Sequence, residues 1–468
     1  MQVKLKFLGA ARNVTGSRHL LEVDGLRILV DCGLYQERQF LERNWDPFII
    51  PPASIDAVLL THAHLDHCGL LPKLAKEGFR GKIYCTGATA QIAQVILLDS
   101  AHLQEEDAEF KRKRHQREGR KGAFPEVPLY TRADAEACFP LFQQVEYQET
   151  VQLGNGVEAA FYDAGHVLGS SIIKVRVRQD LRQRIILFSG DMGRPDRPLV
   201  CDPTVFEEAD YVLIESTYGD RVHEENHDIK QSIADVINST KKAGGNIITP
   251  SFALERAQEI LYYIHELVHD DAIPHLMVFL DSPMAAKITK IFQNHTELFD
   301  CRAKKDTRRN GSLFAFPGLK IVETTSESKA INHIKGTIMV VAGSGMCTGG
   351  RIKHHLVANI SRPESTIMFV GYQAVGTLGR LIVDGAKEVR ILGQKYPVKA
   401  RVVKILGFSA HADRNDLLNW LSQLKKPPIK LFVVHGESES ASNFADFVRE
   451  KKGWDVVVPG YNDEVVLN

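Results

Sequence analysis

Four side chains of the kind that bind metals lie within six consecutive residues: His62, His64, Asp66 and His67. An apolar run at 55–60 precedes them and Pro72 follows in what reads as the first turn of a helix, so they lie in a loop between a strand and a helix. Because His62 and His64 are two residues apart, an extended backbone points both rings the same way. Imidazole and carboxylate groups suit zinc and its neighbours, and four of them this close are costly to desolvate unless a cation holds them. The spacing therefore predicts a metal site, and the alternative is a solvated polar loop with incidental histidines.

Three more candidate site residues follow strands elsewhere in the sequence. Asp31 ends the second arm of a hairpin that Asp24-Gly25 predicts, His166 lies in a glycine-flanked loop, and Asp191 follows a buried-type strand at 184–189. Taken singly, each aspartate is as readily a turn residue, and the histidine is as readily structural. Taken together with the histidine loop, all of them fall just past strand ends, where open sheets place their sites. The combined pattern is far more specific than any one residue.

The strands and helices around these residues indicate more than one domain. A chain of 468 residues exceeds what one core usually supports, so we expect two domains of roughly 150–250 residues each. After about residue 203 strands alternate with helices, as in a parallel sheet. Two more histidines, His411 and His435, follow strands expected at 401–406 and 430–434. We therefore expect the last segment to rejoin the first domain, with the middle segment as an insertion.

The composition is typical of a soluble globular protein. Hydrophobic residues make up 44% and charged residues 25% of the chain, with 58 basic and 58 acidic side chains. Seven scattered cysteines, an odd number without CxxC pairs, argue against a disulfide scaffold and favour a reducing cytoplasm. The first residues alternate like a strand, and no apolar run is long enough to cross a membrane. We therefore expect a cytoplasmic protein with neither a signal peptide nor a membrane partner.

Any binding of nucleic acid must come from a local basic face, because the net charge is zero. Seven basic residues and one acid lie between Lys111 and Lys121, at the end of a helix expected at about 87–121. A second basic cluster lies at 302–309. Most such basic runs are solvated helix faces, and this is the first interpretation of both clusters. A role in nucleic-acid binding is the alternative.

Two glycine-rich segments also lie after expected strands. The segment 343–351 lacks the spacing of a P-loop or of a dinucleotide-binding loop, so nucleotide binding is not expected. It is either a cradle for a backbone phosphate, completed by Arg351, or a plain strand-to-helix turn. The same choice applies to the segment 371–380, which ends in Arg380.

Together these motifs resemble the metallo-β-lactamase superfamily and, within it, the β-CASP nucleases. The run from His62 to His67 matches the superfamily's HxHxDH, and Asp31, His166 and Asp191 match its other strand-end motifs. Three further residues match the motifs that define the β-CASP group, namely Glu215, His411 and His435. A histidine at the last of these positions is typical of RNA-directed members. The resemblance covers nearly the whole chain and extends to the endonuclease subunit of the pre-mRNA cleavage and polyadenylation complex and its compact bacterial and archaeal relatives.

The resemblance implies an α/β protein with an αββα metallo-β-lactamase sandwich and an inserted parallel-sheet β-CASP cap. Residues 1–205 and 398–468 would form the two parts of the sandwich, and residues 206–397 the cap. It also implies two zinc ions per chain. One ion would be held by His62, His64 and His166, the other by Asp66, His67 and His435, and both by the bridging Asp191. Asp31 would support the ligand loop, since carboxylates commonly orient ligand histidines.

The implied reaction is hydrolysis of phosphodiester bonds in single-stranded RNA, leaving a 5′-phosphate and a 3′-hydroxyl. Seven nitrogen and oxygen ligands suffice for two zinc sites, and two metals about 3.5–4 Å apart can clamp the attacking and the leaving oxygen. His411 matches the family's proposed proton donor, and Glu215 would orient it and raise its pKa. Asp66 and Asp191 complete the catalytic set. The residues expected to contact the RNA are Ser409, Arg351 and Arg380.

More than one function is compatible with these motifs. The chain lacks the KH extension of many archaeal members and the extra C-terminal domain of RNase J, so we expect internal cleavage, with 5′-exonuclease activity as the alternative. A small-molecule metallohydrolase of the same superfamily, a non-catalytic RNA-binding scaffold and a DNA nuclease also stay open. The expected partner is single-stranded RNA, and a homodimer is left open.

Overall fold

The computed structural model describes residues 2–120, 122, 124–179, 182–223 and 228–467. The chain divides into two compact units. The first unit comprises residues 1–196, 201–222 and 410–468, and the second comprises residues 197–200 and 223–409. Among the described residues, no helix is long and apolar enough to span a membrane.

The first unit contains two seven-stranded sheets. One has the order β22-β1-β2-β3-β4-β5-β6 and consists of Glu464–Leu467, Val3–Gly9, Arg18–Val23, Leu26–Val30, Ala57–Leu59, Lys82–Thr86 and Phe142–Val145. The other has the order β21-β20-β11-β10-β9-β8-β7 and consists of Val456–Val457, Lys430–Val434, Tyr211–Glu215, Arg182–Phe188, Ser171–Gln179, Val157–Asp163 and Thr150–Gly154. The hairpin expected at Asp24-Gly25 is confirmed, since β2 and β3 pair antiparallel on either side of it.

A continuous apolar core joins the inner faces of these two sheets. Phe7 of β1, Phe161 of β8, Phe188 of β10 and Phe432 of β20 all belong to it, and the rings of Phe7 and Phe432 lie 5.2 Å apart. Alternate residues of β1 are buried, as expected for a strand with one face on a core. Burial of such a ring stabilises the fold by about 1.5–3 kcal/mol.

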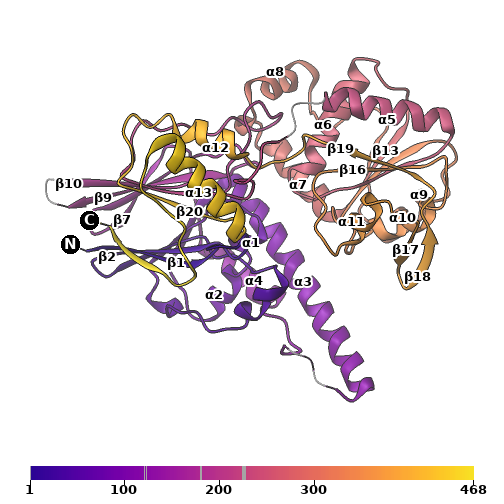
Figure 1. Ribbon diagram of the computed structural model, residues 1–468. Helices are drawn as coiled ribbons and strands as arrows, with labels where there is room; N and C mark the ends of the chain where they lie inside the picture. The colour runs from indigo at the N-terminus through magenta and orange to yellow at the C-terminus, as the bar shows by residue number, and fades with distance from the viewer. Residues whose placement is uncertain (1, 121, 123, 180–181, 224–227, 468) are drawn as a thin grey trace. The chain divides into compact units, whose positions relative to one another are not determined.

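Helices cover the outer faces of both sheets, which completes the αββα arrangement (Figure 1). On the side of the first sheet lie α1 (Leu65–Cys68), α2 (Leu71–Lys76), α3 (Gly87–Glu118) and α4 (Arg132–Cys138). On the side of the second sheet lie α12 (Arg414–Leu421) and α13 (Ser438–Lys452), which share an apolar cluster with it. The long helix α3 ends at Gly119, whose left-handed backbone (φ 61°) caps it, and Lys121 of the expected basic run lies outside the described residues.

The second unit is built on a six-stranded, fully parallel sheet with the order β14-β13-β15-β12-β16-β19. These strands are Leu319–Ile321, Met277–Asp281, Ile338–Ala342, Ile247–Pro250, Thr366–Val370 and Arg401–Ile405. Its helices are α5 (Ile229–Ala243), α6 (Arg256–His269), α7 (Pro283–Asn294), α8 (Cys301–Asn310), α9 (Thr325–Ile331), α10 (Ile352–Asn359) and α11 (Leu378–Val383). A separate hairpin consists of β17 (Glu388–Ile391) and β18 (Gln394–Pro397).

Short 3-10 helices of the chain are η1 (Arg38–Asn44), η2 (Pro52–Ser54), η3 (Phe139–Leu141) and η4 (Thr296–Leu298).

One expectation about the chain's return to the first domain is wrong. The strand expected at 401–406 is β19, and it pairs with β16 at the edge of the second unit's sheet. The return occurs later, because the first unit resumes at Ala410. The strand at 430–434 does belong to the first unit, where β20 pairs with β11.

Candidate metal centre

The candidate site residues lie at one edge of the two sheets of the first unit. In the second sheet, β10, β11 and β20 run parallel, so their carboxyl ends lie at the same edge. Asp191 follows β10, Glu215 is the last residue of β11, and His435 follows β20. Glu215 pairs with Val434, which places His435 directly beside it.

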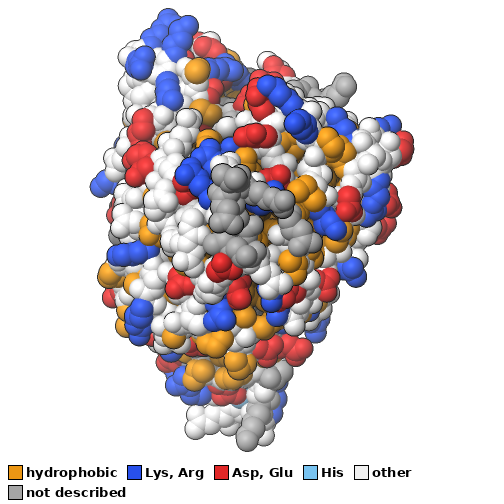
Figure 2. Space-filling model, turned by 90° about the vertical axis from the view of Figure 1, so that its left-hand side faces the viewer, with side chains coloured by type: hydrophobic (Ala, Val, Ile, Leu, Met, Phe, Trp, Pro, Cys, Tyr) orange, Lys and Arg blue, Asp and Glu red, His pale blue; other side chains and the backbone are white. Residues whose placement is uncertain are grey.

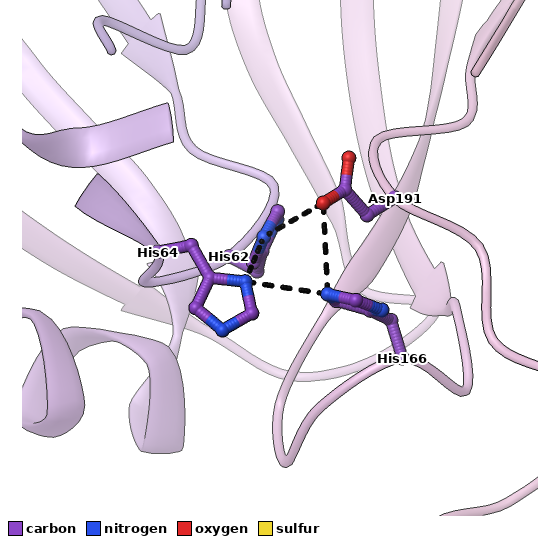
Figure 3. A group of neighbouring side chains, drawn as sticks. All are labelled: His62, His64, His166 and Asp191. Carbon is purple, nitrogen blue, oxygen red and sulfur yellow. Dashed lines mark hydrogen bonds and ion pairs between the residues drawn. The ribbon is translucent and has the colours of Figure 1, made fainter. Parts of the chain in front are cut away.

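One group of four side chains converges on a single point (Figure 3). His62 and His64 come from the loop after β4, His166 comes from the loop between β8 and β9, and Asp191 completes the group. His64 Nδ1 lies 3.0 Å from His62 Nε2 and 3.3 Å from His166 Nε2. Asp191 Oδ2 lies 3.4 Å from His62 Nε2 and 3.5 Å from His166 Nε2.

A second group lies on the other side of Asp191 and consists of Asp66, His67 and His435. His67 Nε2 lies 3.0 Å from His435 Nε2 and 3.1 Å from Asp191 Oδ1. His435 Nε2 also lies 3.6 Å from Asp66 Oδ2. Asp191 therefore presents one carboxylate oxygen to each group.

These residues fit bound metal ions. His67 Nε2 and His435 Nε2 lie 3.0 Å apart, and if both nitrogens are bare they repel, a contact that either a shared proton or a bound cation relieves. In addition, Asp191 Oδ1 is buried and accepts no hydrogen bond of good geometry among the described residues, although His67 Nε2 lies 3.1 Å away. The donor set of imidazole nitrogens and carboxylate oxygens is one that zinc and related ions accept.

The Nδ1 atoms of His62 and His67, which face away from Asp191, have hydrogen-bond partners of their own. His67 Nδ1 lies 2.7 Å from Asp31 Oδ2, and Asp31 Oδ1 also accepts the backbone N–H of Thr61 at 2.8 Å. The Thr61 hydroxyl lies 3.0 Å from both Asp31 oxygens and 3.1 Å from His62 Nδ1. This network fixes both rings so that their Nε2 atoms face the proposed ions.

A threonine that the motif analysis did not single out plays the same part for His435. Thr217 Oγ1 lies 3.2 Å from His435 Nδ1 and 3.2 Å from the His435 carbonyl oxygen. Since the carbonyl can only accept, the hydroxyl gives its proton there and accepts from Nδ1–H, which leaves Nε2 bare. Only the position of Thr217 two residues after Glu215 hinted at this role.

Two of these residues have strained backbones. Asp31 (φ 62°) and His435 (φ 52°) both adopt the left-handed conformation, which costs a non-glycine residue about 1–2 kcal/mol. The surrounding structure holds them there, because His435 N donates to the Ala10 carbonyl at 2.7 Å and Asp31 N to the Leu59 carbonyl at 3.0 Å. Such strain clusters at functional sites.

The pKa values divide the histidines into two classes. Burial and the neighbouring His62 ring lower the pKa of His64 to about 3, and burial likewise lowers the pKa values of His62 and His166. Burial opposes protonation of His67 too, but the charges of Asp191 and Asp31 outweigh it and raise its pKa well above the usual value. The pKa of His435 is raised in the same way by Asp191 and Asp66. In the absence of metal, burial therefore favours the neutral form of the histidines in the first group, whereas the nearby carboxylates favour the protonated form in the second.

His411 and Glu215 form a pair beside Asp191. His411 Nδ1 lies 3.1 Å from both Glu215 oxygens and 4.0 Å from Asp191 Oδ2. Burial lowers the pKa of His411, but the Glu215 charge and hydrogen bond outweigh it and raise the value to about 9. Glu215 itself is fully buried, and it also accepts the backbone N–H of Met192 at 2.6 Å.

The residues expected to contact RNA lie in the second unit. Arg351 Nη1 is paired with Asp281 at 2.7 Å, and its Nη2 donates to the Glu323 carbonyl at 2.7 Å. Arg380 is more exposed and pairs with Asp384 at 2.8 Å, and Ser409 is half-buried. Arg351 is therefore part-buried and already paired within the second unit, whereas Arg380 is more exposed.

The two basic clusters both lie on helices. Lys111, Lys113 and Arg114 of α3 are exposed and pair with acids one turn away, at 2.5, 2.5 and 2.8 Å. The cluster at 302–309 lies on α8, where Arg302 pairs with Glu266. Figure 2 shows basic and acidic side chains interspersed over one face of the molecule, in keeping with the zero net charge.

Comparisons with known proteins match nearly the whole chain. Residues 20–189 match a model described as a metallo-beta-lactamase superfamily domain, and residues 257–382 match a Beta-Casp domain. Residues 395–459 match a Zn-dependent metallo-hydrolase RNA specificity domain. A ribonuclease of Thermus thermophilus is 38% identical over 431 residues, which is 92% of each chain. This chain belongs to the β-CASP family of the metallo-β-lactamase superfamily. Membership makes it a metallo-hydrolase that depends on a metal cofactor.

More distant relatives carry other names. A transcription termination factor of Methanocaldococcus jannaschii is 32% identical over 462 residues, which is 96% of this chain and 69% of that protein. An RNase J-like protein of the same organism is 29% identical over 446 residues, which is 95% of this chain and 94% of that protein. A crystal structure of a protein of unknown function from Enterococcus faecalis superimposes over the full length of both chains with a TM-score of 0.57 at 12% identity, which shows the fold alone.

Proposed function

We propose that this protein is a zinc-dependent endoribonuclease that cuts single-stranded RNA and leaves a 5′-phosphate and a 3′-hydroxyl. The observation that carries the proposal is the position of Asp191, whose two oxygens face two separate groups of ligand-type residues, with the His411–Glu215 pair beside it. The names of the ribonuclease relative and of the RNA specificity domain support RNA as the substrate.

In this proposal the two groups hold one zinc ion each. His62, His64 and His166 would hold the first ion, Asp66, His67 and His435 the second, and Asp191 both. Bound zinc would supply Lewis acidity toward the phosphate and would lower the pKa of the attacking water. Asp31 and Thr61 would keep the ligand rings oriented, because they bind the nitrogens that face away from the ions.

His411 would protonate the leaving oxygen. Its Nδ1–H donates to Glu215, which leaves Nε2 as the nitrogen that gives up a proton. As water attacks phosphorus and loses one proton to solvent, the bond between phosphorus and the 3′-oxygen breaks, and that oxygen takes the Nε2 proton. His411 is left neutral and is recharged from solvent.

The RNA backbone would be gripped by residues of the second unit and of α3. Arg380 and Ser409 stay in this group, together with the cluster at 302–309 and the exposed basic residues of α3. Arg351 leaves the group, because its guanidinium already binds Asp281 and two backbone carbonyls. Phosphate contacts of this kind make binding fall steeply with salt concentration.

The cellular setting and the assembly state complete the proposal. All seven cysteines are free thiols, which suits a reducing cytoplasm. A homodimer stays open, and light scattering on the metal-loaded protein distinguishes it from a monomer.

A circular single-stranded RNA tests the proposal directly. An endonuclease linearises the circle, whereas an enzyme that needs a free end leaves it intact. The purified protein is loaded with zinc and incubated with the circle, with the matched linear RNA and with DNA of the same sequence. We expect linearisation of the circle, products with a 5′-phosphate, and little turnover of DNA. The variant His62→Ala serves as the control for contaminating nucleases.

The second candidate function is 5′-exonucleolytic digestion, which the similarity to an RNase J-like protein favours. An intact circle, combined with release of mononucleotides from the 5′ end of linear RNA, would select this candidate. If neither the circular nor the linear RNA is cleaved, both candidate functions are rejected.

A further inference from the structure

We propose that Tyr218 is a positioning residue for His411, and this inference rests on the proposed role of His411 as the proton donor. Both residues belong to the first unit, Tyr218 in the segment that follows β11 and His411 one residue after the chain returns at Ala410. Their rings meet nearly edge-on, at an angle of 68° and with centroids 6.0 Å apart, which is an arrangement that aromatic rings prefer. Tyr218 acts on the reaction by holding the plane of the His411 ring.

The bond to Glu215 does not by itself hold that plane. His411 Nδ1 lies 3.1 Å from both carboxylate oxygens of Glu215, so the bond fixes one atom of the ring. The ring can still tilt about that atom, and a tilt moves Nε2, which lies across the ring and gives up the proton. Proton transfer needs a donor within about 2.6–3.2 Å of its acceptor, and a misplacement of about 1 Å can cost about 100-fold in rate. A contact with the ring itself is therefore needed.

Tyr218 supplies such a contact from outside the two ligand groups. The rings of His166 and His435 also lie near His411, with centroids 4.6 and 6.5 Å away. Both of those histidines are proposed metal ligands, so a change in either would also disturb the metal. Tyr218 belongs to neither group, and its effect on His411 can be measured separately.

The backbone that carries Tyr218 is held by the core of the first unit. The Ser216 hydroxyl donates to the Val434 carbonyl at 2.9 Å, and the Ser440 hydroxyl of α13 donates to the Ser216 carbonyl at 2.6 Å. Gly219 N also donates to the Ser216 carbonyl, at 3.1 Å, which closes a tight turn with Tyr218 at its third position. The turn is thus fastened to both β20 and α13.

The packing of α13 against this turn leaves no room for movement. A side chain at position 219 would place its Cβ 2.6 Å from the Cβ of Phe444, so only a glycine fits there. Phe444 is fully buried in the apolar cluster that α13 shares with the second sheet. The Arg221 guanidinium carbon lies 5.6 Å from the centre of the Tyr218 ring, within the range of cation–π attraction. The ring of Tyr218 therefore starts from a fixed backbone and has a partner of its own.

The turn is also joined to the segment that carries His411. Tyr218 and Asp413 form an isolated parallel β-bridge, and Asp413 lies two residues after His411. The Asp413 carboxylate accepts two backbone N–H groups at the start of α12, which fixes this segment in turn. Tyr218 therefore contacts the His411 segment through its backbone as well as through its ring, so the two rings keep their relative positions.

The test uses a substrate that does not need the proton. In an RNA whose bridging 3′-oxygen is replaced by sulfur at the cleaved bond, the thiolate leaves without protonation. Tyr218→Leu removes the ring, and Tyr218→Phe removes only the hydroxyl. We expect Tyr218→Leu to lower kcat about 10- to 100-fold on the oxygen substrate and less than about 3-fold on the sulfur substrate, with KM and zinc content unchanged. Tyr218→Phe should stay within about 3-fold of the parent protein on both.

Tyr461→Leu is the matched control. Tyr461 is also a tyrosine of the first unit with a guanidinium over its ring, that of Arg43 at 4.0 Å. Its loss should leave kcat unchanged on both substrates. Tyr218→Met replaces Tyr218→Leu if circular dichroism shows that the leucine variant misfolds.

Three results would overturn the role of the Tyr218 ring. Equal losses of kcat on both substrates, or no loss on either, would show that the ring does not serve proton transfer. An equal defect in Tyr218→Phe would assign the effect to the hydroxyl. A higher KM at unchanged kcat would make Tyr218 an RNA contact.

His411→Ala, measured on the same two substrates, separates this inference from the proposed function. If sulfur does not rescue His411→Ala, the proton-donor role of His411 fails. If sulfur rescues His411→Ala but not Tyr218→Leu, the proton-donor role stands and only the positioning role of Tyr218 fails.

Discussion

His411 Nδ1 lies 3.1 Å from each carboxylate oxygen of Glu215, and the carboxylate is fully buried beneath it. The two residues are 196 positions apart in the chain and meet only because β11 ends next to the segment that follows the second unit. This geometry assigns Nδ1 as the nitrogen that donates to Glu215.

The first prediction concerns this pair. His411→Ala should lower turnover of RNA by about 100- to 10,000-fold, because the leaving oxygen would depart unprotonated. Zinc content, measured by atomic emission, should stay the same. Glu215→Gln should show a weaker defect, since the amide still orients the ring but no longer holds its charge. Loss of zinc from His411→Ala would make this histidine a ligand instead.

The second prediction concerns pH. The pKa of His411 is raised to about 9, so the protonated, active form is present below that value and is lost as pH rises through it. Bound cations nearby lower the value, so kcat should begin to fall at or below pH 9 in the zinc-loaded protein. In Glu215→Gln, the group that raises the pKa is gone, and this descending limb should move to lower pH. If the fall of kcat at high pH stays in place in Glu215→Gln, a group other than His411 causes it.

The third prediction concerns His435. Removing one protein ligand weakens metal binding, so His435→Ala should reduce zinc toward one ion per chain while the fold survives. Cleavage should fall as well, because one metal cannot clamp both oxygens. Thr217→Val, which removes only the hydroxyl that orients the ring, should weaken zinc affinity less. Two tightly held zinc ions and full cleavage in His435→Ala would reject its assignment as a ligand.

The fourth prediction separates two arginines that look alike in the sequence. Arg351→Met should lower the free energy of unfolding by about 1.5–3 kcal/mol, because buried Asp281 loses a charged hydrogen-bond partner. Arg380→Met removes only an exposed pair, so stability should be unchanged while RNA affinity at low salt falls. In urea denaturation, Arg351→Met should be the less stable variant. In RNA binding at low salt, Arg380→Met should be the weaker binder. If Arg351→Met binds RNA more weakly while its stability is unchanged, Arg351 contacts the RNA backbone.

Much of the candidate site was predictable because its residues sit at strand ends. A polar residue just after a buried strand lies at a sheet edge, so Asp31, His62 and Asp191 could each be expected at such an edge, and the family resemblance joined them into one site. The contacts of Thr217 and of Arg197 with Gly407 could not, because they join residues more than 200 positions apart in the sequence and follow no spacing rule.

The position of β19 shows why the domain boundary was harder to predict. Its five residues have the pattern of a half-buried strand that could join either unit's sheet. Only the pairing with β16 assigns the strand to the second unit. Arg351 posed a similar problem, since a basic residue in a glycine-rich loop resembles a phosphate ligand until its partner Asp281, 70 positions earlier, is known.

The distance in sequence between Asp191 and His435 has a consequence for synthesis on the ribosome. More than 200 residues separate them, and β1 near the start of the chain pairs with β22, where Val3 lies opposite Leu467. A nascent chain that has exposed only the first four strand-end motifs lacks the last ligand of the second group and leaves one edge of its first sheet open. The second group and the first sheet can therefore be completed only after almost the whole chain has been synthesised.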